Sequence, residues 1–161
     1  MEPYLLGPEE GESIWMFDAL DTIKADADRT GGAFSVFEFL DFEGSTVPLH
    51  VHNGFGRGFY VVDGEYTFVI GTNTTRVTSG AWVFVPRNVP HAWRCDSSQG
   101  LVLNVTVPGG FEDFYRQAGE KVLDRGKIPD TTEPDVAQLS ALAARYGTSI
   151  VGPPPDPGST R

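Results

Sequence analysis

Histidine occurs three times in this chain, and two of the three stand one residue apart, at His50 and His52, with the third at His91. Side chains two residues apart in a β-strand point to the same face, so His50 and His52 would lie side by side. Imidazole nitrogens bind Fe, Ni, Co, Cu and Zn, and spacing does not distinguish among these metals. A three-histidine site leaves positions open for water, dioxygen or a bidentate substrate. The sequence therefore predicts a divalent transition metal held by His50, His52 and His91.

These histidines lie in a series of short segments rich in aromatic and β-branched residues. Turn-forming residues separate the segments, which are Ala33–Leu40 (AFSVFEFL), VPLHVH, GFYVV, EYTFVI, TTRVT, AWVFV, HAWRC and LVLNVTV. Short strands at this spacing indicate an all-β sandwich or barrel. Ser13–Lys24 predicts one or two further strands. Asp63-Gly64 predicts a hairpin between GFYVV and EYTFVI.

The chain changes character after Val107, where two short helices are expected. Phe111, Phe114 and Tyr115 have helical spacing, with Gly119 as a stop. A second helix would start at Pro134 and end at Gly147; its expected apolar face consists of Val136, Leu139, Leu142 and Ala143. We therefore divide the chain into an arm (1–12), a β-barrel (13–110), peripheral helices (111–149) and a mobile Pro/Gly-rich tail (150–161).

Composition excludes several classes of protein. The net charge is −10, and no cluster of Lys and Arg offers a basic face to nucleic acid or an anionic membrane. No stretch approaches the roughly 20 apolar residues of a membrane span. The acidic start has no apolar run of the signal-peptide kind, so we expect a cytoplasmic protein. A single cysteine excludes an internal disulfide framework and a cysteine-based zinc cluster.

The two histidine segments resemble the two motifs of the cupin superfamily, and within it the small single-domain cupins similar to bacterial quercetin dioxygenases. The first motif is glycine, five residues, His-x-His, a few residues, Glu, six residues and glycine. Here it reads Gly44-STVPL-His50-Val-His52-NGFG-Arg57-GFYVVD-Gly64. The second reads Gly80-AWVFV-Pro86-Arg-Asn88-VP-His91-AWR-Cys95. The resemblance implies a cupin (double-stranded β-helix, or jelly-roll) barrel, a metal on the three histidines, a small-molecule substrate and a homodimer.

The chain departs from the family pattern at Arg57, which replaces a Glu that is often a metal ligand and, in quercetin dioxygenases, the proposed base. Asn88 replaces a glycine and Cys95 an asparagine. A guanidinium neither ligates a cation nor accepts a proton. Arg57 could clamp a substrate carboxylate or enolate at the pocket mouth, or supply the positive charge of an ion that the site has lost. It could also be a solvated loop arginine or pair with Glu38, and Glu38 is itself a candidate for a displaced general base.

Strand parity suggests which side chains line the cavity. Trp93 shares the parity of His91, while Phe59 and Val61 share that of Arg57. Aromatic walls with few polar groups suit a flat aromatic or polyketide-like ligand. Three functions stay open: a metal-dependent, quercetin-dioxygenase-like enzyme acting on an aromatic or enolisable molecule; a non-redox cyclase, isomerase or dehydratase; and a metal-free ligand-binding cupin.

Overall fold

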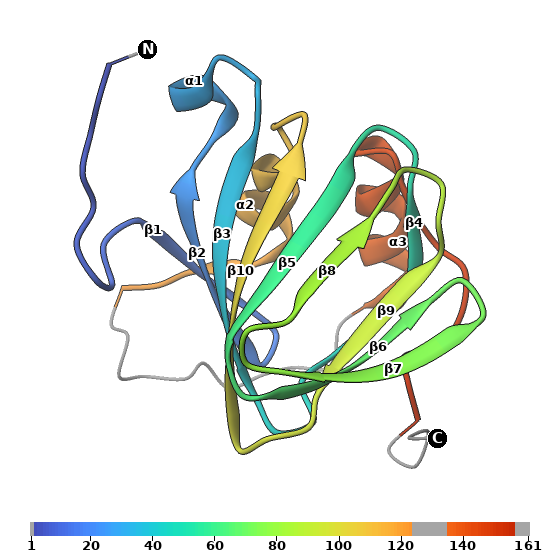
Figure 1. The fold of residues 1–161 in the computed structure, drawn as a ribbon. Coiled ribbons are helices and arrows are strands. Elements are labelled where there is room, and N and C mark those ends of the chain that lie inside the picture. The colour runs from blue at the N-terminus through green and yellow to red at the C-terminus, as the bar shows by residue number, and fades with distance from the viewer. Residues whose placement is uncertain (1, 124–134, 157–161) are drawn as a thin grey trace.

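The computed structural model describes residues 2–123 and 135–156, which form two antiparallel sheets and three short helices (Figure 1). The seven-stranded sheet has the order β11-β1-β2-β3-β10-β5-β8. Its strands are β1 (Glu12–Met16), β2 (Ala19–Ala25), β3 (Ser35–Phe42), β5 (Gly56–Asp63), β8 (Trp82–Val85), β10 (Gln99–Val107) and β11 (Glu120–Lys121). The five-stranded sheet has the order β12-β4-β9-β6-β7. Its strands are β4 (Thr46–His52), β6 (Glu65–Ile70), β7 (Asn73–Thr78), β9 (His91–Cys95) and β12 (Thr148–Ile150). The predicted all-β class is confirmed.

Alternation along the strands places the core between the two sheets. In β3, the side chains of Ser35, Phe37, Phe39 and Asp41 are buried, whereas the residues between them are only partly buried. This period of two is expected for a strand with one face against the core. Aromatic rings from both sheets meet inside, as where Phe39 of β3 stacks on Trp93 of β9 with ring centroids 6.3 Å apart. The inner faces of the sheets therefore present their side chains to one shared interior.

The Asp63-Gly64 turn does not form the predicted hairpin. β5 pairs with β8 and β10, while β6 pairs with β7 and β9, so the chain crosses from one sheet to the other at Gly64. Gly64 has φ 89°, and a Cβ there would lie 2.7 Å from Ser97 Oγ. Glycine is therefore required at this turn whichever strands it joins, which is why the dipeptide alone suggested a hairpin. β4 and β5, which carry His52 and Arg57, are not hairpin partners either, because β4 pairs with β9 and β12.

Two helices follow β10, as predicted, and both contribute to the interior. Helix α2 (Glu112–Ala118) ends at Gly119, and α3 (Val136–Arg145) is followed by Gly147 with φ 66°. Pro134 lies outside the described residues. Tyr115 of α2 and Ala143 of α3 are buried, so the helices are more than an outer cover. The remaining helix, α1 (Ala27–Thr30), forms a single turn between β2 and β3.

The described part of the C-terminal tail runs along β4. The backbone N–H of Val151 donates to the carbonyl of Leu49, and the N–H of Leu49 donates to the carbonyl of Pro153. Pro155 is buried. The mobile tail predicted from composition is therefore wrong for residues 151–156, and residues 157–161 lie outside the described part of the chain.

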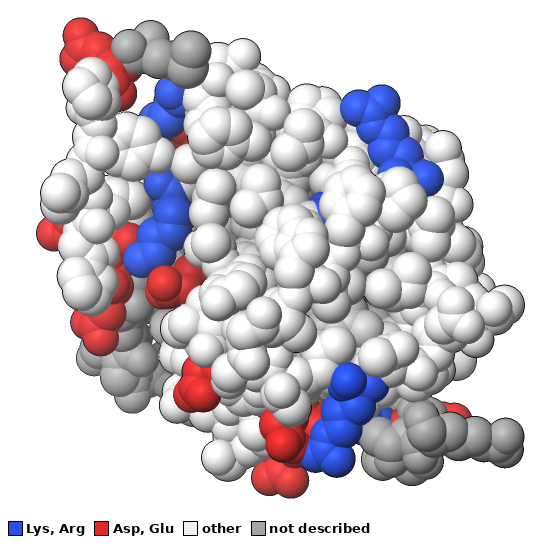
Figure 2. Space-filling model, in the orientation of Figure 1, with Lys and Arg blue, Asp and Glu red and all other residues white. Residues whose placement is uncertain are grey.

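The outer face of β5 and β8 carries exposed aromatic side chains at Tyr60, Trp82 and Phe84. Figure 2 shows few charged side chains over the middle of this face. An exposed apolar patch is typical of a contact surface, and the homodimer stays a prediction. Among the described residues, no helix is long and apolar enough to cross a membrane.

Candidate metal centre and its cavity

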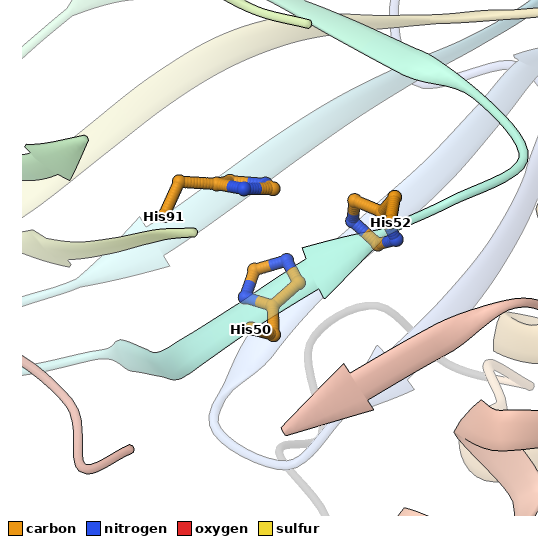
Figure 3. Close-up of side chains that lie close together, drawn as sticks. All are labelled: His50, His52 and His91. Carbon is orange, nitrogen blue, oxygen red and sulfur yellow. The ribbon is translucent and has the colours of Figure 1, made fainter. Parts of the chain in front are cut away.

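Two neighbouring strands of the five-stranded sheet bring the three histidines together. His50 and His52 lie on β4, His91 begins β9, and His50 is the register partner of His91. The ring centroids of the three residues are 4.2–5.1 Å apart. One nitrogen from each ring lies within 4.8 Å of the other two. Figure 3 shows the three side chains grouped in this way.

A neighbouring oxygen holds the Nδ1 atom of each histidine. His50 Nδ1 donates to the carbonyl of Pro48 at 2.8 Å, and His91 Nδ1 donates to the carbonyl of Val89 at 3.0 Å. His52 Nδ1 is 2.7 Å from the hydroxyl of Thr148 on β12. A carbonyl only accepts, so the proton of His50 and His91 sits on Nδ1 and each Nε2 keeps its lone pair. Such outer partners are typical of metal-ligating histidines.

The donor atoms fit a metal ion. His91 Nε2 is buried and has no hydrogen-bond partner among the described residues. Burial, followed by the positive charge of Arg57, lowers the pKa of His91 to about 4. Burial also lowers the pKa of His50 and of His52. The neutral imidazoles that result are the form that binds a cation.

Arg57 points into the interior from β5, on the opposite sheet, and is 1% exposed. Its Nη2 donates to Asn104 Oδ1 at 2.9 Å and to the Tyr115 hydroxyl at 3.2 Å, and its Nη1 lies 3.4 Å from His52 Nε2. Four aromatic rings surround its guanidinium carbon at 5.1–5.8 Å, those of Phe39, Phe59, Trp93 and Phe111. No carboxylate forms an ion pair with Arg57 among residues 2–123 and 135–156. Arg57 is therefore neither a solvated loop residue nor a group at the pocket mouth.

Glu38 does not reach the cavity. It lies on the outward face of β3, between Phe37 and Phe39, and its carboxylate is 3.6 Å from Lys24 Nζ. Strand alternation directs the two phenylalanines inward and Glu38 outward. Glu38 therefore does not pair with Arg57. It also does not face the cavity in which a general base would act, so both hypotheses for Glu38 are wrong.

A cavity of about 110 Å³ borders the histidine site. Its lining includes Arg57 and Trp93, two of the residues predicted to contact substrate. Phe59 and Val61 are instead fully buried core residues outside this lining, and Phe59 packs against the guanidinium of Arg57. Residues after β10 also line the cavity, with Phe111, Phe114 and Tyr115 from the α2 segment and Leu139 and Ala143 from α3.

Two acidic residues of the cavity, Asp21 on β2 and Asp41 on β3, are absent from the sequence predictions. Each is 5% exposed, and both belong to the lining. Burial raises the pKa of Asp41 to about 7, against the hydrogen bond that it accepts from the Tyr66 hydroxyl at 3.0 Å. Burial, reinforced by the nearby Asp41, raises the pKa of Asp21 well above its ordinary value. The sequence contained one signal that could have identified Asp41. It continues the alternation of inward-facing residues that begins with Phe37 and Phe39.

Two facing antiparallel sheets around three inward histidines define this chain as a cupin, and residues 40–107 match the family model of the cupin domain. The chain belongs to the cupin superfamily. It is 31% identical over 118 residues to quercetin 2,3-dioxygenase of Bacillus subtilis (strain 168), an alignment that covers 73% of this chain and 35% of that protein. It is 32% identical over 153 residues to quercetin 2,3-dioxygenase of Aspergillus japonicus, covering 86% of this chain and 39% of that protein.

The chain thus spans little more than a third of the length of the curated relatives that it matches. Among solved structures it resembles KdgF from Halomonas sp., with a TM-score of 0.62 and 15% identity over 70% of this chain and 99% of that one. At this identity the structural likeness shows the fold alone.

Proposed function

We propose that this protein is a metal-dependent cupin enzyme, quercetin-dioxygenase-like, that acts on an aromatic or enolisable small molecule bound as an anion. The observation that carries the proposal is the set of three neutral imidazoles with oriented rings, including the unpartnered Nε2 of His91. The identity to two quercetin 2,3-dioxygenases supports the reaction class. A divalent metal on these nitrogens would supply Lewis-acid chemistry toward substrate oxygens.

Arg57 is the residue that favours an anionic substrate. Its guanidinium keeps a full positive charge at the cavity wall, and no carboxylate contacts it among the described residues. Its Nε is buried without a hydrogen-bond partner in the same part of the chain. In a water-poor site, such a charge stabilises an enolate, phenolate or carboxylate more strongly than it would in water.

The size of the cavity favours a compact substrate. Pockets that enclose drug-sized ligands measure about 300–1000 Å³, whereas this cavity measures about 110 Å³. A single ring or a short keto acid suits this space better than a three-ring flavonol. Trp93 and Phe111 provide the apolar surfaces against which a planar group would pack.

A non-redox reaction is the second candidate, and Arg57 is the observation that favours it. Stabilisation of an enolate by a fixed cation serves a cyclase, isomerase or dehydratase as well as a dioxygenase.

The cytoplasmic location stays a prediction.

Metal analysis tests the proposal first. Purified protein is loaded separately with Fe, Co, Ni, Cu or Zn, and we expect about one ion per chain for at least one metal. Failure to bind any of these ions stoichiometrically would overturn the proposal. Oxygen-electrode assays with catechol and quercetin then separate the two candidates, since only the dioxygenase consumes oxygen.

Arg57 is tested with pyruvate, a compact enolisable anion. Calorimetry should show at least about tenfold weaker pyruvate binding to Arg57→Gln than to the wild type, because a charged hydrogen-bond donor is lost. Glu38→Gln, which changes an outward carboxylate, serves as the control and should bind pyruvate normally. Equal affinity in Arg57→Gln and the wild type would refute the role of Arg57.

A further inference from the structure

Asp21 and Asp41 lie on the same inner face of the seven-stranded sheet. Asp21 of β2 is the register partner of Phe39 of β3, and Asp41 comes two residues after Phe39. Residues in this diagonal relation on neighbouring strands have Cα atoms about 7–8 Å apart and point to the same side. The cavity that borders His50, His52 and Arg57 also borders both carboxyl groups. One cavity therefore borders two of the candidate metal ligands, a cation and two buried acids.

The two acids are buried without the partners that buried carboxylates usually have. Asp21 has no hydrogen-bond or ion-pair partner among residues 2–123 and 135–156, although it is 5% exposed. Asp41 has a single side-chain partner in the same part of the chain, the hydroxyl of Tyr66. An unpaired buried carboxyl group costs stability. Core packing alone does not account for two of them on one cavity wall, whereas a ligand or a proton-transfer step does.

The side chains around Asp21 and Asp41 make the two acids differ in how readily each one ionises. Charged and titratable side chains face them from several elements: Asp18 before β2, Arg57 on β5, Tyr66 on β6, Cys95 on β9 and Tyr115 on α2. Tyr66 donates to Asp41 and stabilises its ionised form, whereas Asp21 has no such donor. Asp41 is thus the acid more readily ionised and therefore able to accept a proton, and Asp21 is the group more readily kept neutral.

We propose that Asp41 is the general base of this cavity and that Asp21 is its proton-bearing partner, which together perform the proton transfer that Arg57 cannot. The proposal rests on the proposed function, because it assumes an enolisable or phenolic substrate in the same cavity. In the step, an O–H or C–H bond of the substrate breaks and its electron pair stays on the substrate as the phenolate or enolate. The proton moves to a carboxylate oxygen of Asp41, and Arg57 stabilises the new negative charge.

Hydrogen–deuterium exchange tests the step apart from any oxidation. Zinc-loaded protein is incubated with pyruvate in D₂O, and proton NMR follows deuterium entering the methyl group. Because general-base catalysis contributes about 10²–10⁴-fold, Asp41→Asn should exchange at least about a hundredfold more slowly than the wild type. Glu38→Gln is the control, because Glu38 lies on β3 with Asp41 but faces outward. This variant should exchange at the wild-type rate.

Calorimetry with the same pyruvate separates the two possible failures. If pyruvate binds but Asp41→Asn exchanges as fast as the wild type, or the wild type gives no exchange above zinc alone, the role of Asp41 is refuted and the binding site stands. If pyruvate does not bind, the proposed function and the inference fail together.

Carbon-13 NMR of aspartate carboxyl groups provides a readout independent of activity, and it applies even if Asp41→Asn does not fold. In wild-type protein, two aspartate signals should titrate at higher pH than the remaining aspartates, and Asp21→Asn should remove one of them. Titration of every aspartate in the ordinary range would overturn the proposal.

Discussion

The two walls of the cavity differ in whether their buried polar side chains have hydrogen-bond or ion-pair partners. The histidine wall is formed by His50 and His52 on the five-stranded sheet, with His91 grouped beside them. Each of the three rings has an oxygen partner at Nδ1. The charged wall, formed by Asp21, Asp41 and Arg57 on the seven-stranded sheet, buries three ionisable groups with no ion pair among the described residues. The first wall is preorganised to hold an ion, while the second keeps charges available for a ligand.

The difference between the two walls indicates which buried side chains lower the stability of the folded protein. A neutral imidazole with a hydrogen-bond partner is tolerated in the interior, whereas an unpaired charge is costly there. The charged wall therefore destabilises the empty protein, and a ligand that complements it would recover part of that cost. On this view the histidine wall assembles the site and the charged wall selects the ligand.

The largest expected effect is the loss of metal from the histidine wall. His50→Ala should weaken zinc binding more than about a hundredfold, because the loss of an outer-shell partner alone already costs 10–100-fold. Asp41→Asn, on the charged wall, should bind zinc with wild-type affinity. Calorimetric titration with zinc measures both. An equal loss of zinc affinity in the two variants would show that metal binding does not depend on the histidine wall alone.

A smaller effect concerns the pH dependence of stability. Burial raises the pKa of Asp41 to about 7, so the folded chain keeps a proton that the unfolded chain releases above about pH 4. The free energy of unfolding should therefore fall between about pH 4 and pH 7, by an amount on the order of a few kcal/mol from this group. Asp21 acts in the same direction.

Asp41→Asn should reduce this slope and be more stable than the wild type at pH 8, since asparagine still accepts the hydrogen bond from Tyr66. Urea unfolding at pH 5 and pH 8 provides the comparison. Glu38→Gln should follow the wild-type curve. Parallel curves for Asp41→Asn and the wild type would contradict the raised pKa.

The smallest expected effect tests the outer partner of one ligand. Thr148→Val removes the hydroxyl next to His52 Nδ1 and should weaken zinc binding about tenfold. Thr106→Val is the matched control, because Thr106 lies on β10 of the other sheet and its buried hydroxyl has no partner among the described residues. The control should keep wild-type zinc affinity, and an equal loss in both variants would rule out a specific role for Thr148.

The histidine wall was predictable because its signal is local. His50 and His52 share a face by strand parity, and His91 follows in the second motif. The all-β class was also predictable, since each strand is marked by its own residues and turns. Strand pairing was not: the Asp63-Gly64 turn joins strands of different sheets. A turn sequence specifies a local backbone conformation, whereas pairing depends on segments far apart in the chain.

The charged wall was visible only in part. Arg57 was singled out as a departure from the family motif, but its depth in the core was not expected, and Glu38 was chosen where Asp41, three residues on, is the acid that faces inward. Thr148 lies 96 residues from His52, so no local pattern joins them.

The sequence by itself determined the three metal-ligand candidates, the β class and the replacement of an acid by Arg57, because residue identity and a period of two are local properties. The tertiary structure decided which acids share the cavity with them. Asp21, Asp41 and Arg57 come from three strands, and only the packing of one sheet against the other places their side chains along the same cavity as His50 and His52.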